Sequence, residues 1–373
     1  MRTRQEEKES RAATKKMATW KKVVLLLFIA IGGGLLAGFF YVKSTLDSVV
    51  VKPREDEPAM QTKKKEGNYR LNFLFLGVDN DMEREKTGLT GTRADSIMLV
   101  SMNTATDKLK VYSIPRDTTA VIYDENNKPV KSPDGSWLNK INAAYEVGKE
   151  EATKNTIEHL FPGIKIDNYA TVNFLSFKGI VDSLGGIDVN VPENIYWKDT
   201  DRVLVNAGQQ TLNGTQALDM ARARYQDDDI HRGYRQQIVM QAIADKASKT
   251  NDVTKLMSVF NEVKGNVRTN MQLDEMMDLY KTINGEGFSF EKIEEEWGSY
   301  NLDGASMVYI PEASRDDMVK QVNDSLTREV PTNTSENGSV RSALKTIEDQ
   351  VKAGSLEFTS DYTNSLISEN LLK

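Results

Sequence analysis

The sequence predicts an α/β protein whose mixed central sheet is flanked by helices, held outside the cell behind one N-terminal transmembrane helix. Three observations predict it. An uncharged apolar run near the N-terminus is long enough to cross a bilayer, and the segment after it is polar. From about residue 70, short apolar runs typical of strands then alternate with longer segments of helical periodicity. We expect this α/β domain to span residues 70–326.

The residues before this domain divide into three parts by composition. Val23–Tyr41 holds nineteen residues without a charge, about the length at which a helix crosses ~30 Å of hydrocarbon. Residues 1–22 carry eight lysines and arginines against three glutamates, so we expect a cytoplasmic N-terminus and an extracellular C-terminal domain, in a single-pass protein of the cell membrane. Residues 42–69 are polar, as expected of a stalk-like linker. A cleaved signal peptide is the alternative.

Within the domain, the spacing of apolar residues separates strands from helices. The first two strands are nearly continuous apolar runs, typical of strands covered on both faces. We expect strands at 72–78, 96–102, 108–114, 169–177, 187–193 and 305–311, and helices at 140–161, 214–223, 230–248, 252–264 and 273–283. Residues 327–373 have the composition of a flexible C-terminal tail, with a short helix at 340–352.

Composition excludes several kinds of chemistry. The net charge is −7, whereas a nucleic-acid binder usually carries a basic surplus, so we expect no nucleic-acid partner. The sequence has no cysteine, which rules out disulfides, thiolate metal sites and cysteine nucleophiles. Its two histidines, His159 and His231, are very little for a zinc site or a histidine-based triad.

Three short polar motifs flank the first three strands. Asp79 follows the first strand in "FLGVD", where ligand-binding groups of open α/β sheets collect. Arg93 and Asp95, in "TRADS", are two residues apart, so an extended segment points both to one face. Arg116 and Asp117, in "SIPRD", leave the third strand at a turn that the proline makes rigid. Taken singly, each motif is also explained by a turn cap or a surface ion pair.

The segment "ARARYQDDDIHRGYRQQ", Ala221–Gln237, concentrates arginine in an acidic chain. Arg222 and Arg224 are about 200° apart around an α-helix, so either the helix unwinds there or one of the two is structural. Arg232 and Arg235 lie three residues apart on one face of the next helix, near an N-terminus that itself favours anions. Four guanidinium groups, each able to grip phosphate oxygens in a fork, indicate a polyanion site. A solvated loop of paired ions is the alternative.

Together the motifs predict a diphosphate held by arginines, with a divalent cation shared by Asp79 and Asp95. Mg²⁺ fits this site because it prefers oxygen ligands, few carboxylates and substrate phosphates. Such an arrangement stabilises charge in phosphoryl transfer by position and electrostatics, without a protein nucleophile.

The ordered set of motifs resembles the LytR-CpsA-Psr family of Gram-positive cell-envelope proteins. The matching elements run from about Asn72 to Lys246 and are "FLGVD", "TRADSIMLV", "SIPRDT", "KINAAY", "VDSLGGIDVNVP" and "LNGTQALDMARARYQDDDIHRGYRQQ", together with the membrane anchor. The resemblance implies a magnesium-dependent phosphotransferase. Its partners would be a polyprenyl-diphosphate-linked anionic glycopolymer, of the teichoic acid or capsule type, and a peptidoglycan acceptor at the membrane.

The resemblance also implies roles for single residues. The diphosphate would be held by Arg93, Arg116, Arg222, Arg224, Arg232 and Arg235, with Lys140 as a further contact. Asp79 and Asp95 would bind Mg²⁺, although the insert "NDMEREKTGLTGT" is longer than in compact members, so Asp81, Glu83 or Glu85 could replace Asp79. Family members bury the lipid tail in an apolar tunnel, which residues 172–184 and 238–247 could line; ordinary core packing is the alternative.

The expected reaction is attack by a peptidoglycan sugar hydroxyl, of N-acetylmuramic acid, on the phosphorus attached to the glycopolymer, with polyprenyl phosphate leaving. Arg93, Asp95, Arg116 and Asp117 would form the catalytic group, and either aspartate could be the base. Three other functions compete: a membrane-bound transcriptional attenuator, a polyprenyl-diphosphate hydrolase and a passive lipid or polymer binder. The attenuator needs a cytoplasmic DNA-binding part, and about twenty-two residues are too few for a helix-turn-helix domain.

Overall fold

The computed structural model describes residues 70–78, 92–103, 108–197, 200–223, 229–249, 267–271, 289–292, 296–323 and 338–367. Among these residues, no helix is both long enough and apolar enough to cross a membrane. The predicted cytoplasmic tail, transmembrane helix and linker lie outside the described ranges, as do the helices expected at 252–264 and 273–283.

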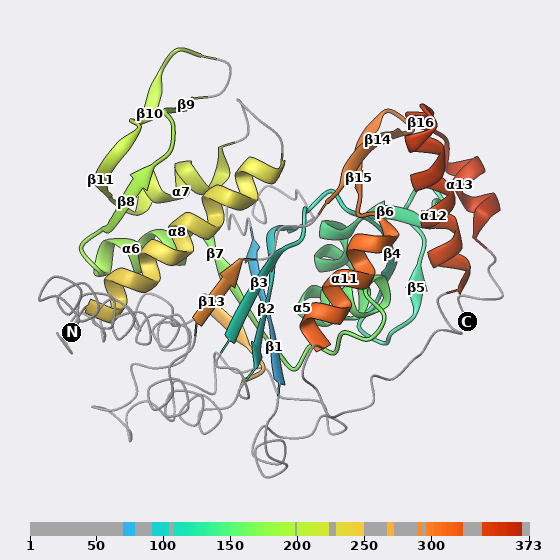
Figure 1. Cartoon of the computed structure of the whole chain (residues 1–373), viewed down its shortest axis with the longest axis horizontal. Coiled ribbons are helices and arrows are strands. Elements are labelled where there is room, and N and C mark those ends of the chain that lie inside the picture. Colours follow the sequence, from blue (N-terminus) through green and yellow to red (C-terminus); the bar gives the residue numbers. More distant parts are fainter. Residues whose placement is uncertain are drawn as a thin grey trace, which may run out of the picture. The chain divides into compact units, whose positions relative to one another are not determined.

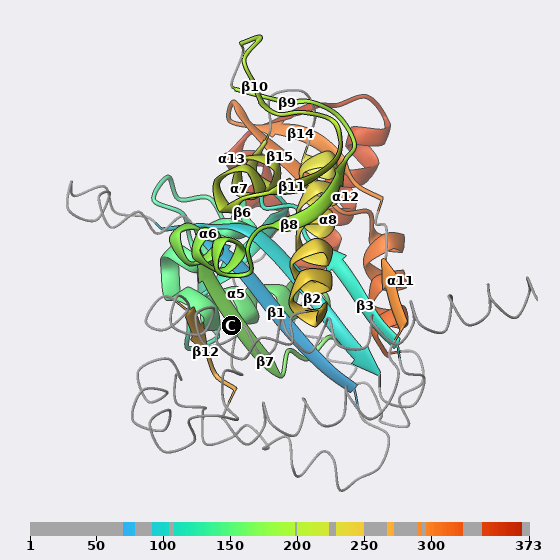
Figure 2. The ribbon, with the colours of Figure 1, turned by 90° about the vertical axis from the view of Figure 1, so that its left-hand side faces the viewer.

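The chain folds into two compact units. The first unit comprises residues 1–67, 106–109 and 170–290, and the second comprises residues 68–105, 110–169 and 291–373. Each unit combines helices with β-strands, as the sequence predicts for an α/β protein (Figures 1 and 2). The predicted domain at 70–326 therefore contributes to both units.

The second unit begins with the three strands expected from the apolar runs. β1, Arg70–Val78, pairs antiparallel with β2, Ala94–Asn103, and β3, Lys108–Ser113, is the next neighbour of β2. Leu74 lies opposite Leu99, and both side chains are fully buried. The middle of β1 is buried without interruption, so the strand is covered on both faces, as a continuous apolar run predicts.

A small antiparallel sheet follows in the same unit. β4, Thr119–Tyr123, pairs with β5, Pro129–Val130, and with β6, Leu138–Lys140. The short helix η1, Ile141–Ala143, then leads directly into α5, Ala144–Leu160. The predicted helix at 140–161 is thus confirmed except at its start, because Lys140 is the last residue of β6.

The helix α5 is kinked near its N-terminus. Gly148 and Lys149 have non-helical backbone angles, and Lys149 has φ 55° and ψ −136°. Side chains with a Cβ rarely adopt this region, which costs about 1–3 kcal/mol for a residue other than glycine. Gly148 also makes room for the kink, since a Cβ there would lie 2.9 Å from Cβ of Ala152 and 3.1 Å from N of Glu125. The kink therefore stores backbone strain at Lys149.

Substituting Lys149→Gly is expected to stabilise the protein by about 0.5–1 kcal/mol. Two effects of the substitution oppose this gain: glycine has greater chain entropy in the unfolded state, and a cation–π contact is lost in which Lys149 Nζ lies 5.3 Å from the centroid of the Tyr145 ring. The free energy gained by relieving the strain is expected to exceed both. Denaturant unfolding of the full chain measures it. Val147→Gly, an exposed position with helical angles in the same turn, is the matched control and is expected to destabilise by about 1 kcal/mol. Equal destabilisation by both substitutions would contradict the assignment of strain.

Residues 338–367 are folded, which corrects the prediction of a flexible tail for this part of 327–373. The amphipathic helix expected at 340–352 is present as α12. Its apolar residues recur at helical spacing and join one core with residues of β1 and β2. The elements are β14, Gly298–Leu302; β15, Ala305–Tyr309; α11, Glu312–Asn323; α12, Gly338–Lys352; β16, Glu357–Phe358; and α13, Ser360–Leu366 (Figure 1).

Where the structure describes it, the first unit contains three helices and short antiparallel pairs. The helices α6, α7 and α8 contact one another in sequence, and α8 also lies along β8 (Figure 2). The pairs are β7 with β12, β8 with β11, and β9 with β10. The bounds are β7, Asn168–Asn173; α6, Phe174–Ser183; β8, Ile187–Val191; β9, Ile195–Tyr196; β10, Val203–Val205; β11, Gly208–Leu212; α7, Gly214–Arg222; α8, Asp229–Lys249; β12, Val267–Thr269; and β13, Ser289–Lys292, which crosses the unit boundary.

The strand predicted at 169–177 is shorter in the structure. It ends at Asn173, whose side chain accepts a hydrogen bond from Ser176 N at 2.8 Å and so caps α6. The apolar residues that follow belong to this helix rather than to a strand. The alternation of the strand and the periodicity of a short helix overlap over these few residues, which is why the pattern does not separate them.

Candidate active site

The turn after β3 carries two of the predicted catalytic residues and is held by neighbouring backbone. The carbonyl of Arg116 accepts a hydrogen bond from Asn142 N at 3.2 Å, and the carbonyl of Asp117 accepts one from Val308 N at 2.9 Å. Pro115 precedes both residues and fixes its own φ. The two side chains therefore start from a backbone that has little freedom to move.

Four predicted site residues meet at this turn. Arg116 Nη1 donates to Asp95 Oδ1 on β2, while Arg116 Nε lies 3.7 Å from Asp117 Oδ1. Lys140 Nζ, at the end of β6, lies 3.1 Å from the same Asp117 oxygen. The four side chains are between 17% and 29% exposed, so they are partly shielded but open on one side. We call Asp95, Arg116, Asp117 and Lys140 the ion cluster.

Two atoms of the ion cluster are paired by charge rather than by a hydrogen bond. Arg116 Nε and Asp117 Oδ1 are buried, and within the described part of the chain their contacts lack the geometry of a hydrogen bond. Buried polar atoms in folded proteins nearly always have such a partner. Arg116 Nε and Asp117 Oδ1 lie 3.7 Å apart and Lys140 Nζ lies 3.1 Å from the same oxygen, so the two atoms are held within the cluster by charge attraction.

Arg93 lies two residues before Asp95 and is more exposed. Its Nε is 3.4 Å from Oε2 of Glu146 in the first turn of α5, and the side chains are 50% and 42% exposed. An ion pair this exposed contributes little to stability, so Arg93 can leave it at small cost. Arg93 is thus available to an anionic ligand near the start of β2.

Two of the predicted site arginines, Arg222 and Arg235, lie at the end of α7 or contact it. The helix ends at Arg222, and Ala223 has an extended ψ of 132°, so of the two alternatives that the sequence left open, the helix ends between Arg222 and Arg224. Arg222 is exposed and stacks over the ring of Phe174, 4.4 Å from its centroid. Burial raises the pKa of Asp219, one turn earlier on the same face, and the positive charge of Arg222 partly opposes that rise.

Arg232 and Arg235 are buried near the start of α8. Arg235 Nη2 donates to Ala223 O at 2.6 Å, and its Nη1 lies 3.3 Å from Oε1 of Glu193. Arg235 therefore fastens α8 to the end of α7, in addition to any contact with a ligand.

Several predicted residues lie outside the described ranges. These are Asp79, Asp81, Glu83, Glu85 and Arg224. Among the described residues there is no group of three or more histidine, aspartate or glutamate side chains that could hold a metal ion. Asp95, the one described member of the predicted metal pair, is paired with Arg116.

Sequence reasoning missed the partners of two arginines. Glu146 lies 53 residues after Arg93, and Glu193 lies 42 residues before Arg235. Neither glutamate belongs to a polar motif, so no local signal marks it. Phe174, whose ring Arg222 covers, lies in a segment that the sequence predicts to be a strand.

The stretches predicted as tunnel linings pack largely inside the first unit. Ile180 and Val181 of α6 are buried, and so are Val239 and Ile243 of α8. Leu175 is the exception, with 55% of its surface exposed. This burial agrees with the alternative of ordinary core packing.

The fold is that of an α/β protein with a cluster of paired charges at the turn after β3. A family model described as the LytR_cpsA_psr family matches residues 38–324, and the chain belongs to this family. The chain is 31% identical over 286 residues to a Bacillus cereus protein named polyisoprenyl-teichoic acid–peptidoglycan teichoic acid transferase TagU, covering 75% of this chain and 88% of that protein.

One further relative, compared both by sequence and by structure, supports the assignment. The chain is 33% identical over 230 residues to the teichoic acid transferase TagV of Bacillus subtilis, covering 60% of this chain and 55% of that protein. The crystal structure of B. subtilis TagV matches with a TM-score of 0.54 at 27% identity, covering 68% of this chain and 96% of that one. The match confirms the predicted mixed α/β fold.

Proposed function

We propose that the protein transfers an anionic glycopolymer from polyprenyl diphosphate to peptidoglycan. The ion cluster carries this proposal, because it places two cations against two carboxylates at a rigid turn, with all four side chains partly exposed. The names of the TagU and TagV relatives supply the substrate class, a polyisoprenyl-linked teichoic acid and peptidoglycan.

In the proposed reaction, a peptidoglycan hydroxyl attacks the phosphorus that carries the glycopolymer. A new P–O bond forms to the acceptor, the P–O bond to polyprenyl phosphate breaks, and the acceptor proton passes to a carboxylate. Asp117 and Asp95 are the two candidates for this base. Arg116 and Lys140 offset the negative charge that grows on the phosphate oxygens, an effect strengthened by their partial burial. A role for Arg93, Arg222, Arg232 and Arg235 in holding the diphosphate remains a prediction.

Magnesium is part of the proposal. The donor set suits a cation bound by one or two carboxylates together with substrate phosphates, since the Asp95 side chain is 29% exposed. Asp95 and the predicted Asp79 would hold the ion, which supplies further positive charge to the phosphates. The membrane anchor at 23–41, with the domain outside the cell, would keep the site beside a substrate embedded in the bilayer.

A reconstituted transfer assay tests the proposal. The full chain in detergent is mixed with a polyprenyl-diphosphate-linked teichoic acid precursor and uncrosslinked peptidoglycan glycan strands, with Mg²⁺ or with EDTA. Polymer joined to glycan is the expected product, and EDTA is expected to abolish it. Free polymer phosphate without joined product would identify a hydrolase instead, and bound but unchanged precursor would identify a passive binder.

A further inference from the structure

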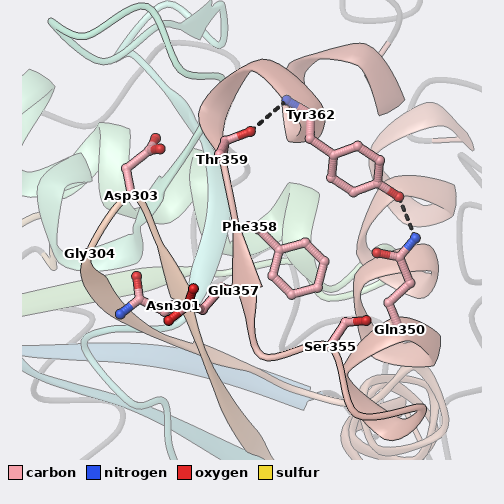
Figure 3. A pocket seen from close by; sticks show the side chains of 9 residues that line it. All are labelled: Asn301, Asp303, Gly304, Gln350, Ser355, Glu357, Phe358, Thr359 and Tyr362. Carbon is pink, nitrogen blue, oxygen red and sulfur yellow. Dashed lines mark hydrogen bonds between the residues drawn. The ribbon is translucent and has the colours of Figure 1, made fainter.

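A pocket separate from the ion cluster lies in the C-terminal part of the second unit, where α12, β16 and α13 meet the turn between β14 and β15 (Figure 3). Its volume is about 750 Å³, within the range of small-molecule sites. The ion cluster contributes no residue to it. The lining residues are Asn301, Asp303, Gly304, Gln350, Ser355, Glu357, Phe358, Thr359 and Tyr362.

The pocket combines the family domain with residues beyond it. The family match ends at residue 324, whereas α12, β16 and α13 follow residue 337. β16 pairs parallel with β14, with Asn301 opposite Glu357. Asp303 N donates to Phe358 O at 3.0 Å, and Asp303 Oδ2 accepts from Ser360 N at 2.9 Å. These bonds fix both walls, so the pocket is formed before any ligand arrives.

The lining has the chemistry of a saccharide site. Asn301, Gln350, Ser355 and Thr359 offer amide and hydroxyl groups that can both donate and accept hydrogen bonds. Glu357 adds an exposed carboxylate, a strong acceptor for sugar hydroxyls. Such groups, interleaved along one wall, match the alternating donors and acceptors of a polyhydroxylated ligand.

Aromatic rings form the apolar part of the same wall. Phe358 and Tyr362 stack with ring centroids 6.1 Å apart and planes inclined by 28°. The Tyr362 hydroxyl accepts a hydrogen bond from Gln350, which holds the ring's polar end (Figure 3). Rings that present an apolar body beside polar groups suit the mixed C–H and hydroxyl surface of a sugar.

The charge of the pocket selects against anions. Among the described residues that line it there is no lysine or arginine, whereas Asp303 and Glu357 contribute two carboxylates, the first of which accepts hydrogen bonds from Ser360. A phosphate-rich polymer would meet uncompensated negative charge there. The ion cluster differs, since Arg116 and Lys140 balance its two carboxylates.

We propose that this pocket binds the neutral N-acetylated glycan of the peptidoglycan acceptor. The inference rests on the proposed function, which requires an uncharged sugar backbone as acceptor and a polyanion as donor. A pocket that hydrogen-bonds sugar hydroxyls and repels phosphate binds the acceptor glycan and excludes the polyanionic donor.

Direct binding tests the pocket without any transfer reaction. The full chain in detergent is titrated with an N-acetylglucosamine tetramer by isothermal calorimetry, and separately with soluble polyglycerol phosphate. The tetramer is expected to bind. Glu357→Gln is expected to weaken it about tenfold or more, the effect of losing a hydrogen bond to a charged group. Gln350→Ala is expected to weaken it as well.

Asp361→Asn is the matched control, an exposed carboxylate on α13 outside the lining, and is expected to leave binding unchanged. Thermal unfolding of each variant checks that the second unit stays folded. Absence of tetramer binding, equal binding in all variants, or equally strong binding of polyglycerol phosphate would overturn the proposal.

Transfer kinetics separate this inference from the proposed function. Glu357→Gln is expected to raise the KM for glycan strands about tenfold, with kcat and the KM for the lipid-linked donor unchanged. Transfer with an unchanged acceptor KM would overturn the pocket and leave the function standing. Tetramer binding that depends on Glu357, in a protein without transfer activity, would overturn the function and retain a glycan site.

Discussion

Replacing Arg116 by alanine is expected to lower kcat for glycopolymer transfer by about 100- to 1,000-fold, the usual effect of removing one aligned donor from a site of developing charge. Arg116 is the one side chain that contacts both carboxylates of the ion cluster. Without it, Asp95 and Asp117 lose their shared guanidinium, and the remaining charge disfavours a phosphate ligand. Initial rates of product formation with the reconstituted substrates measure the change.

Arg116→Lys gives an intermediate test, because an ammonium group keeps the charge but cannot reproduce the planar fork. It is expected to recover part of the rate. Arg202→Ala removes an exposed arginine of the first unit and serves as a control with the wild-type rate. If Arg116→Ala folds normally and retains a rate within twofold of wild type, the ion cluster is not the catalytic centre.

Gly214→Val is expected to destabilise the protein by about 3 kcal/mol or more, a cost at the upper end of overpacking. Gly214 begins α7 where this helix touches α6, and a Cβ there would lie 2.7 Å from Cα and 2.8 Å from C of Lys178. Those atoms are backbone, so no side-chain rotation relieves the clash. Denaturant unfolding of the full chain, monitored by far-UV circular dichroism, measures the loss.

Thr215→Val, the next residue of the same helix, is the control for a β-branched side chain. Thr215 is exposed, so this change is expected to stay within about 0.5 kcal/mol of wild type. A similar small effect at Gly214 would mean that α6 and α7 can separate without cost. Since α7 carries Arg222 and its end is bonded to Arg235, a real clash is also expected to disturb both arginines.

The sequence predicted the elements whose patterns are long and regular. β1, β2 and β3 follow from apolar runs, and α7 and α8 from helical periodicity. The sheet of β4, β5 and β6 was missed, because its strands are two to five residues long and too short for a period to appear. The C-terminal segment was predicted to be flexible because its overall composition is polar. Composition alone does not show that the apolar residues of α12 lie on one face of the helix.

The site could be predicted only where its residues form local motifs. Asp95, Arg116 and Asp117 stand at strand ends, and the structure brings them together with Lys140, which the family resemblance supplied. Glu146 and Glu193 could not be found in this way, because their pairing depends on chain segments more than 40 residues apart. The saccharide pocket has the same origin, since Asn301 and Glu357 meet only through strand pairing.

The parallel pairing of β16 with β14 has a consequence for how the protein matures. Asn301 can pair only after Glu357, 56 residues further along the chain, has been synthesised. This sheet therefore closes only after residue 357 has left the ribosome. Until then Tyr300 and Leu302 lack the Phe358 ring and the α12 side chains that cover them in the finished protein. A protein truncated at residue 324, where the family match ends, would expose these apolar side chains permanently. We therefore expect such a truncated protein to aggregate.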